Sequence, residues 1–124
     1  MRYTPSHEWI RTEIEMGQEI STVGITSYAR DELGEVVYVE LPLIGDFIEM
    51  GEEVAVVEST KAAVDIYSPA TGEVIAVNEA LPGNLDLLNS SPETLGWLFK
   101  MKVANQKDVE ELLGKEEYLL MIGS

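Results

Sequence analysis

One lysine lies where two apolar, β-branched runs meet. Lys61 follows residues 54–58, which read Val-Ala-Val-Val-Glu, and precedes residues 62–66, which read Ala-Ala-Val-Asp-Ile. This pattern predicts a β-hairpin with the lysine in its turn. A primary amine held out on a rigid turn is suited to acylation, and the resulting amide would hold a mobile cofactor. The pattern alone leaves open a second interpretation, an unmodified surface lysine in an ordinary turn.

The chain offers few other groups for chemistry. It contains no cysteine, which excludes a disulfide framework and a protein thiolate. His7 is the only histidine, so His7-Glu8 cannot form a zinc-protease motif, which needs a second one, and we assign His7 a structural role. The sequence shows no metal-binding cluster, Ser-His-Asp set or phosphate-binding loop. Lys61 is therefore the strongest candidate for a functional residue.

Short strands are predicted along most of the chain. Residues 8–15 and 19–25 flank a glycine-containing turn and predict a hairpin. Residues 26–33 predict a short helix, because Thr26 is a suitable N-cap and Gly34 follows the helix end. The remaining predicted strands cover residues 36–39, 47–48, 54–58, 64–67, 74–77 and 97–103.

The last part of the chain has a different pattern. Segment 82–92 is rich in Gly, Asn and Ser and predicts a long surface loop. Beyond it, apolar residues recur at helical spacing. Gly114 divides this C-terminal extension, about 107–122, into two predicted helices at 108–113 and 116–122.

An internal repeat relates two of the predicted strands. Residues 34–45 and 72–83 align without a gap, and half of the aligned pairs are identical. Coincidence between two β-rich segments is the alternative. We predict two similar β-units related by a pseudo-twofold axis, with Lys61 near the link between them. The predicted fold class is mostly β, a flattened barrel or sandwich of two antiparallel sheets. Its core is expected to centre on Val36, Val39, Val54, Val56, Ile66, Val74, Ile75 and Val77.

Composition limits the classes of partner. The 124 residues indicate a single domain over 1–124, with its core at about 20–103. The formal net charge is −15, which argues against nucleic acid and anionic membranes and favours partners with basic docking surfaces. The N-terminus has no signal or transit character, and no segment approaches a membrane span. We expect a cytoplasmic monomer, although an organellar protein without its presequence would show the same features.

Six motifs, in order along the chain, resemble the H protein family of the glycine cleavage system. They are Ser6-His7-Glu8-Trp9, residues 23–29 (VGITSYA), residues 33–42 (LGEVVYVELP), residues 58–65 (ESTKAAVD), Gly72-Glu73-Val74, and residues 89–97 (NSSPETLGW). Each motif alone is weakly specific, but together they extend from about Tyr3 to Ile122. A doubled β-unit with an exposed lysine at its junction is also typical of lipoyl and biotinyl carrier domains.

The resemblance implies a carrier without catalytic activity of its own. Lys61 would bear lipoic acid in amide linkage. This arm would carry the aminomethyl group of glycine from glycine decarboxylase, which uses pyridoxal phosphate, to aminomethyltransferase, which uses tetrahydrofolate. Dihydrolipoyl dehydrogenase would reoxidise the arm, and a lipoate ligase or lipoyl transferase would attach it. The absence of cysteine agrees with a cofactor that supplies the sulfur.

The resemblance also implies site residues, and no metal is among the ligands. The implied residues are Glu58 and Gly72 for lipoylation recognition, and Ser6, Glu8 and Asp65 for the cleft that holds the loaded arm. Plain surface carboxylates are the alternative for Glu8 and Asp65. One departure from the family is Glu32, which stands where some members carry a histidine near the bound arm.

Other carriers agree less well with the sequence. A lipoyl domain of a 2-oxoacid dehydrogenase usually has Asp directly before the lysine and lacks the C-terminal helices. A biotin carrier flanks its lysine with methionines, whereas Thr60 and Ala62 flank Lys61. The serious alternative is an H-like, stand-alone lipoate carrier that serves a lipoyl relay or sulfur metabolism.

Overall fold

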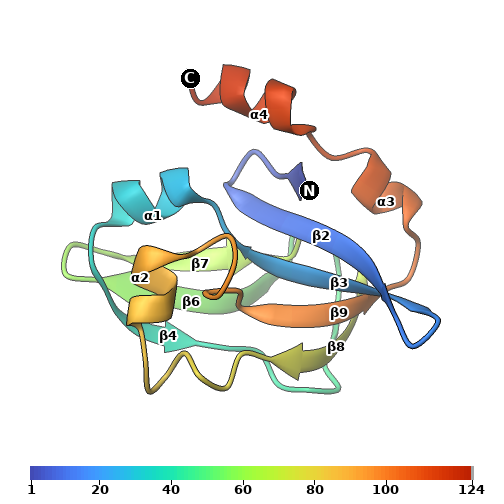
Figure 1. The fold of residues 1–124 in the computed structure, drawn as a ribbon, viewed down its shortest axis with the longest axis horizontal. Helices are drawn as coiled ribbons and strands as arrows, with labels where there is room; N and C mark the ends of the chain where they lie inside the picture. Colours follow the sequence, from blue (N-terminus) through green and yellow to red (C-terminus); the bar gives the residue numbers. More distant parts are fainter. Residues whose placement is uncertain (124) are drawn as a thin grey trace.

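Two antiparallel sheets form the body of the protein, in a computed structural model that describes residues 1–123 (Figure 1). Within these residues the larger sheet has six strands in the order β1-β2-β3-β9-β8-β5, and the smaller has three in the order β4-β6-β7. The strands are β1 (Arg2–Tyr3), β2 (Glu8–Glu15), β3 (Gln18–Ile25), β4 (Val36–Glu40), β5 (Phe47–Ile48), β6 (Glu53–Ser59), β7 (Ala63–Tyr67), β8 (Gly72–Val77) and β9 (Phe99–Val103). The helices are α1 (Ser27–Leu33), α2 (Asp86–Ser90), α3 (Lys107–Glu110) and α4 (Lys115–Met121). The predicted fold class is confirmed, as a sandwich and not as a closed barrel.

The two predicted hairpins are present. In the first, Glu15 pairs with Gln18, and the turn residues Met16 and Gly17 both have positive φ, 51° and 78°. This backbone suits a two-residue hairpin turn, because its twist matches that of the flanking strands. In the second, β6 and β7 are antiparallel neighbours, and the turn between them contains Lys61.

Helix α1 begins and ends as its sequence predicts. The Thr26 side chain accepts a hydrogen bond from the Ala29 N–H, and Gly34 ends the helix with a φ of 84°. That conformation favours glycine, because a Cβ atom is strained there. Leu33 is the buried residue of the helix and packs in the core between the sheets. The cap and the buried leucine together hold α1 beside the β6–β7 hairpin.

The core lies between the two sheets, and most of its predicted members are buried. They include Val36, Val39, Val54, Ile66 and Val74. The prediction was wrong for Val56 and Ile75, which are half-buried, and Val77 only packs against the core edge. The register shifts between Glu53 and Ala55 and again between Val74 and Ala76. Such irregularities change which residues face inward, so Ala55 and Val57 are buried in place of Val56.

Segment 82–92 was predicted as a surface loop, and this prediction was wrong. It contains α2, and Leu88 within that helix is fully buried. The Asn89 side chain accepts a hydrogen bond from the Val36 N–H at 2.8 Å and donates one to the Val36 carbonyl at 3.1 Å. These bonds cover an edge of β4 that would otherwise present unpaired backbone groups. The polar composition of the segment therefore reflects an edge-capping role.

Both repeat segments contain a strand, one in each sheet. Residues 34–45 include β4 of the smaller sheet, and residues 72–83 include β8 of the larger. The twofold relation between them stays a prediction. The C-terminal helices α3 and α4 are confirmed, with Gly114 as the N-cap of α4.

Replacing Gly24 with alanine is expected to destabilise the fold. A Cβ at Gly24 would lie 2.7 Å from the indole ring of Trp9. Trp9 is fully buried and cannot move aside easily, because its Nε1 donates to the Pro92 carbonyl at 3.0 Å. We expect Gly24→Ala to lower the free energy of unfolding by about 1–3 kcal/mol, measured by denaturant titration. In the matched control Gly83→Ala, nothing lies within 4 Å of the new Cβ, and equal losses in both variants would contradict the steric argument.

Candidate functional site

The turn that carries Lys61 is held by its own polar groups. The Ser59 hydroxyl oxygen accepts hydrogen bonds from the N–H groups of Lys61 and Ala62, both at 3.1 Å. The Ser59 N–H donates to the Ala62 carbonyl at 2.8 Å, and the Thr60 N–H donates to the Glu35 carbonyl at 3.2 Å. Lys61 is exposed and makes no ion pair within residues 1–123. Its amine is therefore accessible while its backbone is fixed.

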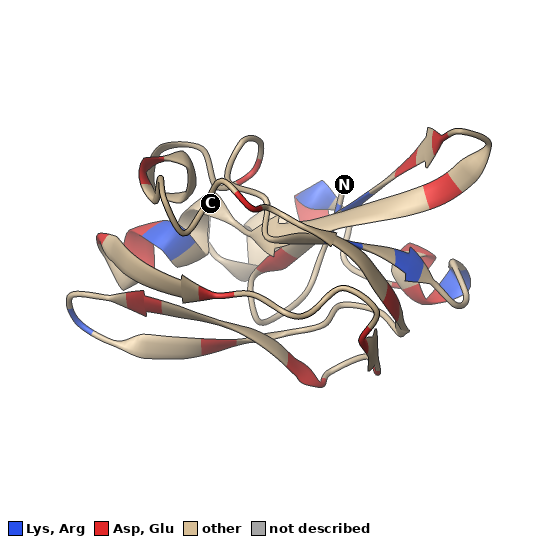
Figure 2. Ribbon diagram, turned by 90° about the horizontal axis from the view of Figure 1, so that it is seen from below, with Lys and Arg blue, Asp and Glu red and all other residues tan. Residues whose placement is uncertain are grey.

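The hairpin tip is also electrostatically distinct. Acidic segments outnumber basic ones over the molecule, and the tip of the β6–β7 hairpin is the only basic stretch of the smaller sheet (Figure 2). The side chain of Lys61 runs back over the end of α1, where a Cβ on Gly34 would lie 3.1 Å from the Lys61 Cε. A side chain at position 34 would thus obstruct the lysine, in addition to straining the helix end.

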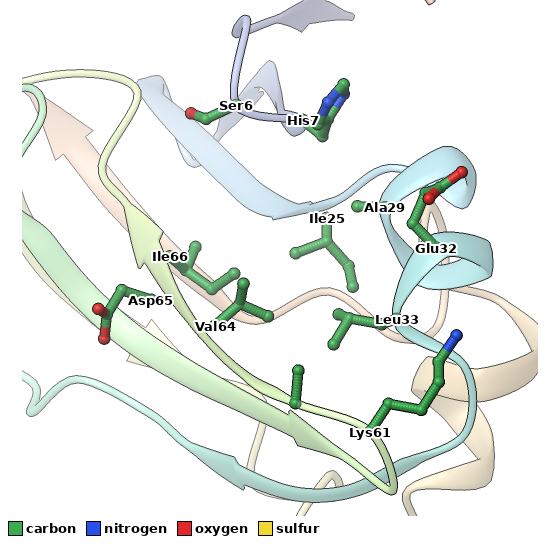
Figure 3. Close-up of a pocket in the computed structure, with 11 residues that line it drawn as sticks. Ser6, His7, Ile25, Ala29, Glu32, Leu33, Lys61, Val64, Asp65 and Ile66 are labelled. Carbon is green, nitrogen blue, oxygen red and sulfur yellow. The ribbon is translucent and has the colours of Figure 1, made fainter.

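A cleft of about 250 Å³ opens beside Lys61. It lies between the hairpin, α1 and the loop that follows β1 (Figure 3). Its walls are mainly apolar and are formed by Ile25, Ala29, Leu33, Ala62, Val64 and Ile66. Its polar members are Ser6, His7, Glu32, Lys61 and Asp65. An apolar cleft with a few polar groups around it suits a long acyl chain that ends in a polar cargo.

Ser6 lines the cleft as predicted, but Glu8 lies behind it. Glu8 is 2% exposed and is absent from the cleft wall. Its Oε1 accepts hydrogen bonds from the hydroxyls of Thr4 at 2.5 Å and Ser6 at 2.7 Å, and its Oε2 accepts one from the Tyr67 N–H at 3.4 Å. The structure therefore places Glu8 behind the cleft wall, in contact with Ser6; its part in holding the arm stays a prediction.

Asp65 lies at the lip of the cleft with its carboxylate turned away. Val64 and Ile66 point into the cleft, and Asp65 between them points to the other side of the strand (Figure 3), as alternation along a strand requires. Asp65 pairs with Val56, and both line a shallow hollow with Glu40 and Glu53. The carboxylate thus belongs to the outer face of the smaller sheet.

The two residues implied in lipoylation recognition lie on different elements, Glu58 in β6 and Gly72 in β8. Glu58 is half-buried near the tip, paired with Tyr38 and Ala63. Gly72 is buried at the start of β8, beyond the opposite end of β7. A Cβ at Gly72 would lie 2.1 Å from the Lys102 carbonyl oxygen. The structure therefore places Glu58 near Lys61 and gives Gly72 a packing role; recognition by either stays a prediction.

Two cleft residues were missed as site residues. Glu32 lines the cleft from α1, and its carboxylate makes no hydrogen bond or ion pair with other residues in 1–123. Its spacing of three residues from Ala29 predicts that the two lie on neighbouring positions of one helix face, and this signal could have identified it. His7 also lines the cleft, and its Nδ1 lies 2.8 Å from the hydroxyl oxygen of Tyr118. Only the tertiary structure brings that pair together.

Neither a metal site nor a membrane-spanning helix is found in the described part of the chain. Within residues 1–123, no group of at least three His, Cys, Asp or Glu side chains is placed to hold a metal ion. In the same part of the chain, no helix is long and apolar enough to cross a membrane.

Comparisons with known proteins agree with the fold and indicate its family. A family model described as Glycine cleavage H-protein matches residues 1–123. The glycine cleavage system H protein of Psychrobacter cryohalolentis is 50% identical over 118 residues, 95% of this chain and 91% of that protein. That of Thermotoga maritima is 44% identical over 117 residues, 94% of this chain and 91% of that protein. The crystal structure of a glycine cleavage system H protein from Mycobacterium marinum superposes with a TM-score of 0.86 at 35% identity, and covers 98% of this chain and 95% of that chain. The chain therefore belongs to the glycine cleavage H-protein family.

Proposed function

We propose that this protein is a lipoyl carrier that transfers the aminomethyl group of glycine between two enzymes and catalyses no reaction itself. The observation that carries the proposal is Lys61, an exposed amine on a rigid turn beside an apolar cleft, in a chain of the H-protein family. Lipoic acid on Lys61 would supply the redox-active disulfide that the cysteine-free chain lacks.

The residues present fit such a group. The acyl chain would lie against the apolar wall formed by residues such as Leu33 and Val64. Ser6 and Glu32 are the polar groups available to a cationic cargo, because the Asp65 carboxylate faces outward. A carboxylate near an amine favours its protonated form, and protonation ties up the nitrogen lone pair that would otherwise expel the sulfur as thiolate, the first step of hydrolysis. The docked cargo would therefore be protected from hydrolysis.

The proposed partners follow from this role. Glycine decarboxylase would load the arm, aminomethyltransferase would unload it to tetrahydrofolate, dihydrolipoyl dehydrogenase would reoxidise it, and a lipoate ligase or lipoyl transferase would attach it. The net charge of −15 supports docking to basic surfaces on these enzymes. We propose that the chain acts as one domain over 1–124, as a monomer in the cytoplasm.

Reconstitution tests the proposed function directly. The lipoylated protein, mixed with glycine decarboxylase of a related bacterium, is expected to support exchange of labelled bicarbonate into glycine, because exchange requires an acceptor for the aminomethyl group. The unlipoylated protein serves as the matched control and should give no exchange above the enzyme alone. A lipoylated protein that is inactive here but passes its lipoyl group to another acceptor protein would indicate the alternative, a stand-alone carrier.

A further inference from the structure

We propose that Tyr118 of the C-terminal helix is a positioning residue for the cleft, which holds His7 in one tautomer and one orientation at the cleft wall. This proposal depends on the proposed function in one respect, which is that the lipoyl arm docks in this cleft. Tyr118 is the buried residue of α4, and its hydroxyl touches both the loop and the helix that form the cleft.

The hydroxyl of Tyr118 joins two walls of the cleft. Its oxygen lies 2.8 Å from the Nδ1 of His7 and 2.7 Å from the Oγ1 of Thr26. Thr26 is the N-cap of α1 and accepts the Ala29 N–H, and the Thr26 N–H donates to the His7 carbonyl at 3.0 Å. His7 and Ala29 both line the cleft. One phenol therefore connects the loop that carries His7 to the start of the helix opposite.

Burial of Thr26 determines the direction of these hydrogen bonds. Thr26 is 1% exposed, so its hydroxyl proton needs a protein acceptor. Within residues 1–123, the Tyr118 oxygen is the only acceptor that its side chain reaches. Thr26 therefore donates to Tyr118. Tyr118 is itself only 3% exposed, so its single proton also needs a protein acceptor, and the Nδ1 of His7 is the one that it reaches within residues 1–123. This leaves Nδ1 without hydrogen and puts the imidazole proton on Nε2.

The imidazole ring is also held from two sides. Its centroid lies 4.7 Å from that of the Tyr28 ring and 5.7 Å, edge to face, from that of Tyr118. His7 adopts a φ of 74°, which is uncommon for a residue other than glycine and persists only where the surroundings impose it. The His7 N–H donates to the Thr4 carbonyl at 3.1 Å. Backbone and ring contacts thus define one ring position.

The C-terminal helix depends on the same residue. The Tyr118 ring stacks on Tyr3, with ring centroids 4.6 Å apart and planes 9° apart. Helix α4 lies above the N-terminal strand and outside the two sheet layers (Figure 1). Burial raises the pKa of the Tyr118 hydroxyl above its usual value, as does the nearby carboxylate of Glu93, so the phenol keeps its proton for the bond to His7. The same residue, Tyr118, therefore both attaches α4 and contacts the cleft wall.

The test uses His7 as an internal reporter, because it is the only histidine. A long-range proton–nitrogen NMR spectrum of the full chain with isotope-labelled histidine shows the tautomer directly. The wild-type protein is expected to show the form with the proton on Nε2. Tyr118→Phe should give a mixture of both tautomers, because the fixed donor to Nδ1 is lost. Tyr3→Phe and Tyr28→Phe, which remove hydroxyls that do not contact His7, should retain the wild-type tautomer.

Arm docking is read in the same spectra. The His7 signals of lipoylated protein are expected to differ from those of unlipoylated protein, and Tyr118→Phe should reduce this difference, because the ring is then no longer held in one orientation at the cleft wall. The extent of lipoylation by mass should be unchanged. Thr26→Ser keeps the hydroxyl that donates to Tyr118, so it should show the wild-type tautomer and the wild-type signal difference. This control stays informative even if Tyr118→Phe folds poorly.

Failure of the positioning role of Tyr118 and failure of arm docking would give different results. A wild-type tautomer with the proton on Nδ1, or a tautomer unchanged in folded Tyr118→Phe, would overturn the positioning role of Tyr118. Identical His7 signals with and without the lipoyl group, together with the expected tautomer, would leave that role standing and would contradict docking of the arm in this cleft.

Discussion

Lys61→Ala protein, made together with lipoate and a lipoate ligase, is expected to gain no lipoyl group, whereas the wild-type protein gains one. The reason is geometric as well as chemical. Lys61 is the only basic residue between the start of β4 and the end of β7, and its turn is fixed by the hydrogen bonds of the Ser59 side chain. Intact-mass measurement of both proteins gives the result directly.

Two further variants make this prediction specific. Lys61→Arg keeps the positive charge but lacks the primary amine, so it should also gain no mass. Lys107→Ala removes an exposed lysine from α3 and should be modified like the wild type. Modification that persists in Lys61→Ala would show that another lysine carries the group, and the proposed function would lose its main support.

Glu8→Gln is expected to shorten the lifetime of the aminomethyl-loaded protein by up to about tenfold, if one charge-assisted hydrogen bond of ~1.5 kcal/mol is weakened. Glu8 is buried and orients the Ser6 hydroxyl, which donates to it at 2.7 Å. With its proton directed to Glu8, the Ser6 oxygen presents its lone pairs to the cleft and can accept from a cationic amine. The measurement is the release of formaldehyde and ammonia from loaded protein without the transferase.

The other two carboxylates give the comparison. Asp65→Asn should leave the lifetime within about twofold of the wild type, because its carboxylate points to the outer face of the sheet, away from the cleft, and an exposed charge contributes little. Glu32→Gln should have an intermediate effect, since an exposed charge contributes only about 0–1 kcal/mol. All three variants should be lipoylated normally. A larger effect of Asp65→Asn than of Glu8→Gln would mean that the carboxylates act in the opposite order to the one inferred from their positions.

Local patterns were sufficient for the elements of this fold. The run of β-branched residues around Lys61 predicts the hairpin, and Thr26 and Gly34 predict both ends of α1, because caps and turns depend on only a few neighbouring residues. The same holds for the hairpin turn at Met16-Gly17. Segment 82–92 shows the limit of this approach: its composition predicts a loop, but Leu88 and Asn89 find partners on β4 and in the core that no local rule includes.

The residues of the candidate site also fall into two groups, those that local sequence predicts and those that only packing places. The position of the candidate amine follows from local sequence alone, because Lys61 is part of a local turn, and the resemblance indicated Ser6. Which face of β7 carries the Asp65 carboxylate was decided by sheet register, and the burial of Glu8 by packing of the N-terminal loop. The contact of His7 with Tyr118 joins residues at opposite ends of the chain. Side-chain direction and long-range contacts arise only when sheets pack, so the tertiary structure alone decides which of the predicted polar groups can reach a docked arm.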